Sequence, residues 1–361
     1  MSRLAVLQWR TKALPVAIGL GILAVVLAVT GPHLVALHNT LATTCVVRGD
    51  CALARSTLLQ SDQDLRLALT ILMVVVPGLL GVFWGAPLVA REFEMGTYRL
   101  VWTQVHPPRW LLVELIVGGG ASMAIAGLMS LMVTWWYGPI DAAQMMVYAS
   151  FGQRDIVPMG YALLAFALGV QMGALTRRVL PAMMLTLIGF VGLQLIFGTV
   201  VRPHLLPPVR EALAITNASA VSGGWGYGSY TGPFGSSTPG ILFPPTPTIP
   251  NAWVYAVQLV NNSGARLTAQ ALAQACPLLG AGAHGSSGGD GVGGGTTKIH
   301  ARQGAVLHAC ITKLAATYHE EVTYQPARQY WSLQWMEFAV YLALAVGLGG
   351  CARWSVRRGM A

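Results

Sequence analysis

The chain has 361 residues, of which 54% are hydrophobic and only 10% are charged. Soluble globular domains carry about 25% charged residues, so this composition excludes an ordinary soluble protein and indicates one that crosses a membrane several times. The formal net charge of +9 does not indicate a nucleic-acid-binding protein, because the only lysines are Lys12, Lys298 and Lys313 and the arginines form no basic face.

Six stretches are long and apolar enough to cross a bilayer as helices. A hydrocarbon core about 30 Å thick needs about 20 mostly apolar residues, and an open, non-helical backbone would leave its polar groups unpaired there. Glu114 in the third stretch and Glu337 in the sixth are the only acidic residues within them. The expected spans are residues 13–30, 67–90, 111–137, 156–176, 179–201 and 332–352.

The distribution of basic residues sets the expected orientation. With the N-terminus inside, the short inner segments and the tails hold 11 of the 22 basic residues, and the rest are diluted over much longer segments. Short loops rich in arginine face the cytoplasm, so both termini are predicted to be cytoplasmic. The fold class is therefore an all-α polytopic membrane protein with a large extracellular domain between the fifth and sixth spans. The expected division is residues 1–201, 202–331 and 332–361.

Within the large outer segment the sequence predicts few regular elements. Residues 202–215 are rich in proline and end in a short predicted surface helix, and the Gly, Ser, Thr and Pro content of residues 223–250 predicts ordered coil. Helical periodicity predicts helices at residues 265–276 and 302–321. The glycine-rich residues 281–297 between them are predicted to be a flexible linker.

Four of the five cysteines fall in the predicted outer segments. Disulfides persist on the oxidising side of a membrane, so an even number of cysteines there favours bridges. The pairing that joins near neighbours is Cys45 with Cys51 and Cys276 with Cys310. The fifth cysteine, Cys351, is expected to be an inert packing residue at the inner end of the sixth span.

No catalytic constellation is present in the sequence. The histidines are scattered, and neither a zinc-protease motif nor a dithiol motif occurs. Residues 291–298 superficially resemble a phosphate-binding loop but lack its Gly-Lys-Ser/Thr ending. We therefore predict that this chain is not an enzyme and holds no cofactor or metal of its own.

The segment between the second and third spans is the densest patch of charge in the first half of the chain. Arg91-Glu92-Phe93-Glu94-Met95-Gly96-Thr97 is predicted to form a short amphipathic helix on the cytoplasmic face, and Pro107 and Pro108 stop its continuation. Helices that rest on lipid favour Lys and Arg on their polar face. Adjacent glutamates therefore indicate a protein partner.

Three blocks of sequence resemble a known family. These are GVFWGAPLVAREFEMGTYRLVWTQ at 81–104, Arg109-Trp110, and YQPARQYWSLQWMEFAVYLALA at 324–345, which an arginine-rich tail follows. They are similar to the permease subunits of type-2 ABC exporters, in particular the actinobacterial branch. The E-x-E-x-G-T run after the second span marks the loop that such permeases present to their ATPase. The chain departs from its relatives at residues 105–108, where they have a Ser-Val-Thr-Arg-like stretch.

The resemblance implies a half-transporter whose two permease copies pair, most simply as a homodimer, above two cytoplasmic ABC ATPase chains that bind ATP and magnesium. It implies that residues 91–104 are the ATPase-coupling segment. Glu92 and Glu94 would supply charge contacts, Phe93 and Met95 would fill a groove of the ATPase, and Gly96 would permit a turn. The coupling residues implied are Arg91, Glu92, Phe93, Glu94, Met95, Gly96, Thr97, Tyr98 and Arg99.

In the family the second and fifth spans flank the central path. The residues that would line it here are Met73, Phe83, Met183, Met184, Phe190, Gln194 and Phe197. This lining is mostly apolar, so the expected function is efflux of a hydrophobic or amphipathic compound across the plasma membrane. The alternative is a sensor or resistance module that detects an extracellular peptide or antibiotic without net transport.

Overall fold

The computed structural model divides into two compact units, and each is described by itself. Unit 1 comprises Met1–Leu205 with Tyr330–Ala361, and unit 2 comprises Leu206–Gln329, against the predicted outer domain of residues 202–331. The structure describes residues 2–48, 62–96, 107–142, 151–215, 226–231, 237–243, 249, 252–268, 271, 274, 309 and 312–358.

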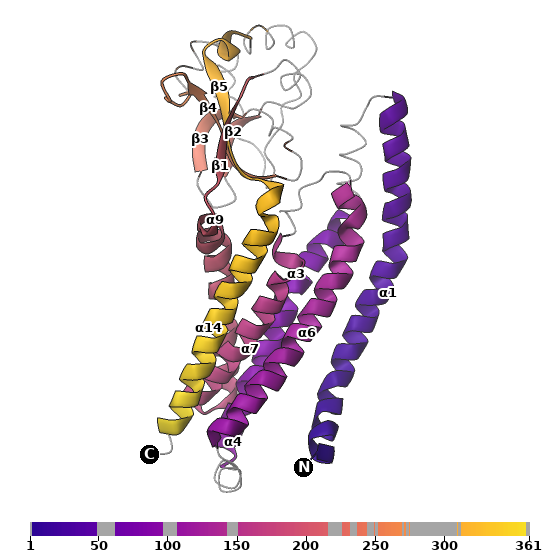
Figure 1. Ribbon diagram of the computed structural model, residues 1–361, viewed down its shortest axis with the longest axis vertical. Coiled ribbons are helices and arrows are strands. Elements are labelled where there is room, and N and C mark those ends of the chain that lie inside the picture. The colour runs from indigo at the N-terminus through magenta and orange to yellow at the C-terminus, as the bar shows by residue number, and fades with distance from the viewer. Residues whose placement is uncertain are drawn as a thin grey trace, which may run out of the picture. The chain divides into compact units, whose positions relative to one another are not determined.

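Unit 1 is a bundle of long helices (Figure 1). Among its described residues, six helices are long and apolar enough to cross a membrane, which confirms the predicted number of spans. The second and fifth spans are each interrupted by a π-helical turn. Helix α1 begins, and α14 ends, at the same end of this unit (Figure 1). The elements are α1 (Ser2–Arg48), α3 (Gln63–Leu80), η1 (Gly81–Gly85), α4 (Ala86–Glu94), α6 (Pro107–Ala142), α7 (Val157–Thr176), α8 (Val179–Ile196), η3 (Phe197–Val201), α9 (Arg202–Leu205) and α14 (Tyr330–Arg358).

Helix α7 is the centre of the bundle. It packs against α14, α6, α4, α8 and α3, and 72% of its apolar stretch is buried inside the protein. Helices α1 and α8 differ, because only 17% of the apolar stretch of each is buried. Their remaining apolar side chains face outward, as expected for helices that contact lipid or another chain.

The second span and α7 contact each other backbone to backbone. A Cβ atom added at Gly169 would lie 2.3 Å from the carbonyl oxygen of Gly81, and one added at Gly81 would lie 2.4 Å from that of Ala165. A Cβ atom at Gly173 would lie 2.5 Å from the carbonyl oxygen of Ala86. Small residues allow membrane helices to approach this closely, and Gly169 and Gly173 have that packing role here.

The same holds for two of the three consecutive glycines of α6. A Cβ atom at Gly118 would lie 2.4 Å from the ring of Phe166, and one at Gly119 would lie 2.9 Å from Leu163. Gly120 faces open space, since nothing lies within 4 Å of its added Cβ atom. Packing therefore explains Gly118 and Gly119.

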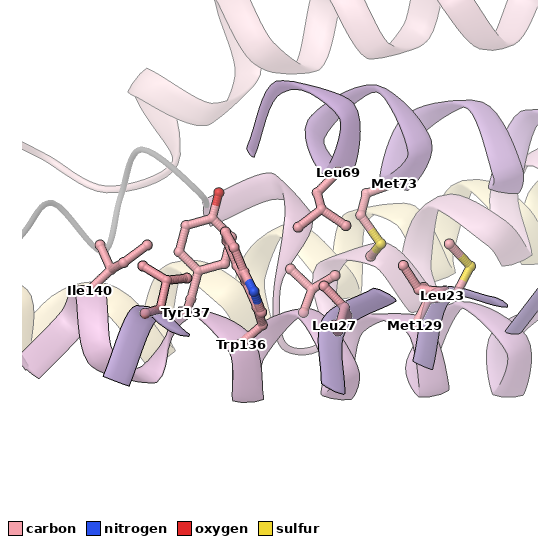
Figure 2. Packing of buried hydrophobic residues seen from close by; sticks show 10 residues of the cluster. Leu23, Leu27, Leu69, Met73, Met129, Trp136, Tyr137 and Ile140 are labelled. Atoms are coloured by element: carbon pink, nitrogen blue, oxygen red, sulfur yellow. The ribbon is translucent and has the colours of Figure 1, made fainter. Parts of the chain in front are cut away.

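A second core joins α1, α3 and α6. Leu27, Leu69 and Met73 are at most 2% exposed, and they pack together with Trp136 (Figure 2). The indole Nε1 of Trp136 donates a hydrogen bond to Thr30 Oγ1 over 3.0 Å. The large ring therefore fills the space between helices and also satisfies its own polar atom.

Unit 2 contains antiparallel sheets. A three-stranded sheet has the order β1-β5-β4, from β1 (Val209–Leu213), β5 (Tyr318–Gln325) and β4 (Trp253–Asn261). β2 (Gly226–Thr231) and β3 (Ser237–Phe243) form a two-stranded sheet. In the larger sheet Val209 pairs with Tyr324 and Trp253 with Gln325, so the last strand along the chain lies between the other two.

The prediction of an all-α chain is therefore wrong for unit 2. The expected surface helix after Pro208 is strand β1, the expected coil at 223–250 contains the β2–β3 pair, and the expected helix at 302–321 ends before Tyr318. Residues 265–268 are not helical, although the described residues 271 and 274 are. In these segments, pairing between strands overrides the helical spacing of the apolar residues. Local periodicity does not register such pairing.

The predicted disulfides lie outside the described residues. Cys51, Cys276 and Cys310 are among the residues that the structure does not describe, and Cys45 is described only as part of helix α1. Their pairing stays a prediction. Cys351 is exposed on α14 and not packed, contrary to expectation.

One prediction concerns the close contact of Gly169 with the backbone of the second span. Gly169→Ala forces a methyl group against the backbone of the second span, and overpacking of this kind costs about 1–3 kcal/mol, so the melting temperature of the detergent-solubilised chain should fall by about 5–10 °C. Gly192→Ala is the matched control, because nothing lies within 4 Å of its added Cβ atom. Equal melting temperatures for the two variants would contradict the close contact at Gly169.

A second prediction concerns Glu320 of β5. Its side chain is 2% exposed, and burial raises its pKa from 4.5 to about 7. Folding therefore favours the protonated carboxyl, so unit 2 should lose stability as pH rises from about 4.5 to about 7. Amide exchange of Tyr318–Gln325 in the full chain, corrected for intrinsic rates, should accelerate over that range.

The matched variants of this measurement are neighbours on one strand. Glu320→Gln should remove the pH dependence, since the amide does not titrate. Glu321→Gln should keep it, because the pKa of Glu320 is raised by its own burial. The same pH dependence in the Glu320→Gln protein would show that another group causes it.

Candidate functional site

The second span ends in helix α4, which stops shortly before Gly96. α4 ends at Glu94, and the N–H of Gly96 donates to the carbonyl oxygen of Phe93 over 3.2 Å. Gly96 has a φ of 70°, a left-handed conformation that glycine adopts without strain. The predicted amphipathic helix is therefore the last turn of α4 and not a separate helix. We call residues 91–96 the α4 tip.

Phe93 of the α4 tip packs on the bundle. Its half-buried ring contacts the apolar cluster that includes Val89, Leu111 and Ala352. The guanidinium carbon of Arg177 lies 5.2 Å from the ring centroid, within cation–π distance. Phe93 thus faces its own chain, whereas Met95 is 54% exposed and free to contact another protein.

Glu94 of the α4 tip binds the start of α8. Its Oε2 accepts a hydrogen bond of 3.0 Å from the N–H of Val179, the first residue of that helix. Arg178, which precedes the helix, is extended and makes no capping bond with its own side chain. A carboxylate at a helix N-terminus satisfies a free N–H group and opposes the positive end of the helix dipole.

Small residues bring α4 close to the α7–α8 turn. Ala86 and Ala90 of α4 are fully buried against Ala182 of α8, and Val179 and Met183 pack around them. The turn itself closes with Arg177 in a left-handed conformation, φ 54°, whose N–H donates to Gly173. The α4 tip and this turn therefore form one connected site at this end of unit 1.

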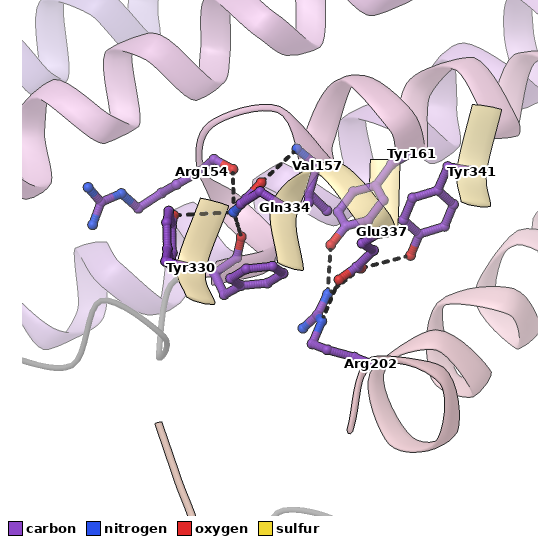
Figure 3. Close-up of polar contacts among 9 residues, drawn as sticks. Arg154, Val157, Tyr161, Arg202, Tyr330, Gln334, Glu337 and Tyr341 are labelled. Carbon is purple, nitrogen blue, oxygen red and sulfur yellow. Dashed lines mark hydrogen bonds and ion pairs between the residues drawn. The ribbon is translucent and has the colours of Figure 1, made fainter. Parts of the chain in front are cut away.

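A buried ion pair lies near the other end of the fifth span. Arg202 of α9 donates from Nε to one carboxylate oxygen of Glu337 over 2.9 Å and from NH2 to the other over 2.7 Å. Glu337 is fully buried, and Tyr161 and Tyr341 also bond to the pair (Figure 3). The bidentate geometry uses both carboxylate oxygens, which offsets the cost of burying the charges.

Gln334 continues this polar cluster one turn away on α14. Its Oε1 accepts from the N–H of Val157 over 3.1 Å, and its Nε2 donates to the carbonyl oxygen of Phe151 over 3.1 Å. Tyr330 donates to Asp155 beside it. Figure 3 shows that Gln334 and Glu337 of α14 together hold the start of α7 and the end of the fifth span.

A comparison with known protein families identifies the family of the chain. Residues 17–202, just over half of the chain, match the family described as ABC-2 membrane transporter related. The chain belongs to the ABC-2 membrane transporter related family. This ABC-2 permease family comprises membrane subunits of ABC transporters, which are not typically catalytic and normally partner with an ATPase subunit. Searches of curated proteins and of solved structures returned no match.

The α4 tip of this ABC-2 family member contains six of the nine residues expected to contact an ATPase. Arg91, Glu94, Met95 and Gly96 are exposed, and Glu92 and Phe93 are half-buried. The expected contacts Thr97, Tyr98 and Arg99 lie outside the described residues.

The residues expected to line a path divide into two groups. Met73, Phe190 and Phe197 are at most 3% exposed and pack within unit 1; Phe197 stacks on Tyr341 with ring centroids 4.1 Å apart. The others present a face that the chain itself does not cover. Phe83 is 57% and Met184 69% exposed, and Met183 and Gln194 are half-buried.

Sequence reasoning missed Arg177 and Arg202. From sequence both are basic residues of loops. In the structure each lies at the end of a span, where Arg177 contacts the ring of Phe93 and Arg202 contacts Glu337. For Arg202 the signal was Glu337, a carboxylate inside another span, which needs a buried partner. For Arg177 no signal in the sequence pointed to Phe93.

The Arg202–Glu337 pair yields a stability prediction. Glu337→Leu leaves a buried guanidinium without its counter-charge, and Arg202→Met leaves a buried carboxylate without its own, each at a cost of about 3–5 kcal/mol, whereas the double variant Arg202→Met/Glu337→Leu should cost less than either single change. Melting curves of the four proteins in detergent give the coupling energy. Strictly additive effects of the two changes would contradict the pairing.

Proposed function

We propose that this chain is the membrane-spanning permease subunit of an ATP-binding cassette exporter. In this proposal a separate cytoplasmic ATPase hydrolyses ATP, and the permease converts that cycle into efflux of a hydrophobic or amphipathic compound. The family match supports the membrane role. The observation that carries the coupling role is the α4 tip, an exposed charged turn that is continuous with a membrane span and bonded to the next helical hairpin.

The proposed assembly contains two permease copies and two ATPase chains in the plasma membrane, with both termini and the α4 tip in the cytoplasm. Helices α1 and α8 support this assembly. Only 17% of the apolar stretch of each is buried inside the protein, so both offer apolar surface to a second copy. The ATPases would bind ATP and magnesium, and the permease would bind neither.

The apolar surface along the second and fifth spans favours an apolar cargo. Phe83 and Met184 are both apolar and exposed. Methionine adapts to ligands of different shape because its side chain is unbranched and polarizable. A path between two copies would draw on these exposed residues and not on the buried Met73 or Phe190.

The test is purification of the tagged full chain from native membranes in mild detergent. An ABC ATPase should co-purify and hydrolyse ATP. Met95→Asp places a charge at the most accessible apolar residue of the α4 tip and should reduce the co-purified ATPase about tenfold, as for a central interface residue. Asp64→Lys, an exposed site at the start of α3, should leave it unchanged.

Two results would contradict the proposal. One is the absence of an ABC ATPase from the purified wild-type protein, and the other is equal ATPase recovery with Met95→Asp. Accumulation of fluorescent amphipathic dyes in inverted vesicles then separates an exporter from a sensor, because a sensor accumulates none.

A further inference from the structure

Helix α8 begins in a way that its own sequence does not explain. Most helices receive their first capping bond from a side chain immediately before them. Arg178 supplies none, and the bond comes from Glu94, which lies 85 residues earlier in the chain. The first residue of the fifth span is therefore held by the last residue of α4.

The remaining contacts between α4 and α8 are smooth. They involve Ala86 and Ala90 against Ala182, with Val179 and Met183 around them, and all of these contacts are apolar and therefore have no preferred direction. Such a surface permits sliding, so it does not by itself make α8 follow α4. The carboxylate of Glu94 is the directional contact between the two, and it is exposed to solvent, so it can be made and broken readily.

The α7–α8 turn is also positioned on the α4 tip. Arg177 takes a left-handed conformation at the end of α7 and lies over the ring of Phe93. The residue on each side of Arg178 thus contacts the α4 tip, Arg177 through its guanidinium and Val179 through its N–H. Movement of the tip would act on the turn and on the first turn of α8 together.

We propose that Glu94 is a positioning residue that transmits movement of the α4 tip to α8. Only 17% of the apolar stretch of α8 is buried inside the protein, so much of the helix surface is not enclosed by the described neighbouring helices. The inference rests on the proposed function, since an ATPase bound at the tip would supply the movement. It differs from the role expected from sequence, in which Glu94 contacts the ATPase directly.

The first measurement uses the full chain alone in lipid nanodiscs. Glu94→Ala should accelerate amide exchange in residues 179–183 about fivefold, as expected when a helix loses its cap. Glu94→Gln keeps an oxygen that accepts the bond and should stay within about twofold of wild type. Asp64→Ala, an exposed carboxylate at the start of α3, is the matched control and should have no effect.

The second measurement uses the permease with its co-purified ATPase, before and after trapping with ATP and vanadate. In wild type, trapping should change exchange in residues 179–183. In Glu94→Ala that change should disappear when the samples are compared at equal amounts of co-purified ATPase that hydrolyses ATP, and Glu94→Gln should restore it. If Glu94 had only a structural role, its substitution would not abolish the response of α8 while ATP hydrolysis continues.

Three results would overturn the inference. A response of α8 to trapping in Glu94→Ala would show that another contact transmits the movement. Loss of the ATPase from Glu94→Ala, but not from wild type, would make Glu94 a direct ATPase contact and leave the proposed function intact. Absence of the ATPase from wild type as well would reject the proposed function, and this inference with it.

Discussion

The close contact between α7 and the second span is the constraint on which the arrangement of unit 1 depends. Water cannot drive helices together in a bilayer, so association relies on close packing and polar bonds. Here Gly81, Gly85, Gly169 and Gly173 let two backbones meet at distances that no Cβ atom permits. The π-helical turn η1 lies at this contact, and such turns often mark positions where a helix adapts to function.

The polar clusters follow from that packing. Once α7 is central, its start lies beside α14 and the end of the fifth span, where Gln334 and Glu337 bond to Val157 and Arg202. A buried carboxylate inside a membrane span needs such partners. The cluster of Gln334 and Glu337 therefore determines which helices meet at that end of unit 1. At the opposite end, the α4 tip joins helices through weaker, exposed contacts.

The sequence predicted those features that depend on composition over long windows. The six spans and the dense charge at residues 91–96 follow from apolar length and charge spacing, and each of these is a local property. Unit 2 was predicted less well. β5 pairs with β1 and β4, which both precede it by more than 50 residues of chain, and the local periodicity that predicts a helix at 302–321 does not register partners that distant.

The candidate site was predicted in part for the same reason. Residues 91–96 could be located from sequence, but the bonds that give them meaning join Glu94 to Val179 and Phe93 to Arg177, across 85 residues in the first case. The resemblance to type-2 ABC exporter permeases implied that Phe93 fills a groove of the ATPase. Its half-buried position on the bundle shows that the same pattern also suits a residue that anchors the tip.

The fifth span is thereby held differently at its two ends. At one end Arg202 is locked by a bidentate, buried ion pair, which is costly to break. At the other the first residue of α8 is held by a single exposed carboxylate, and between them most of the helix is uncovered. The π-helical turn η3 lies directly before Arg202 and departs from regular α-helical geometry there. A helix that is fixed at one end and loosely capped at the other can pivot about the fixed end, so movement is cheapest at the end that the α4 tip controls.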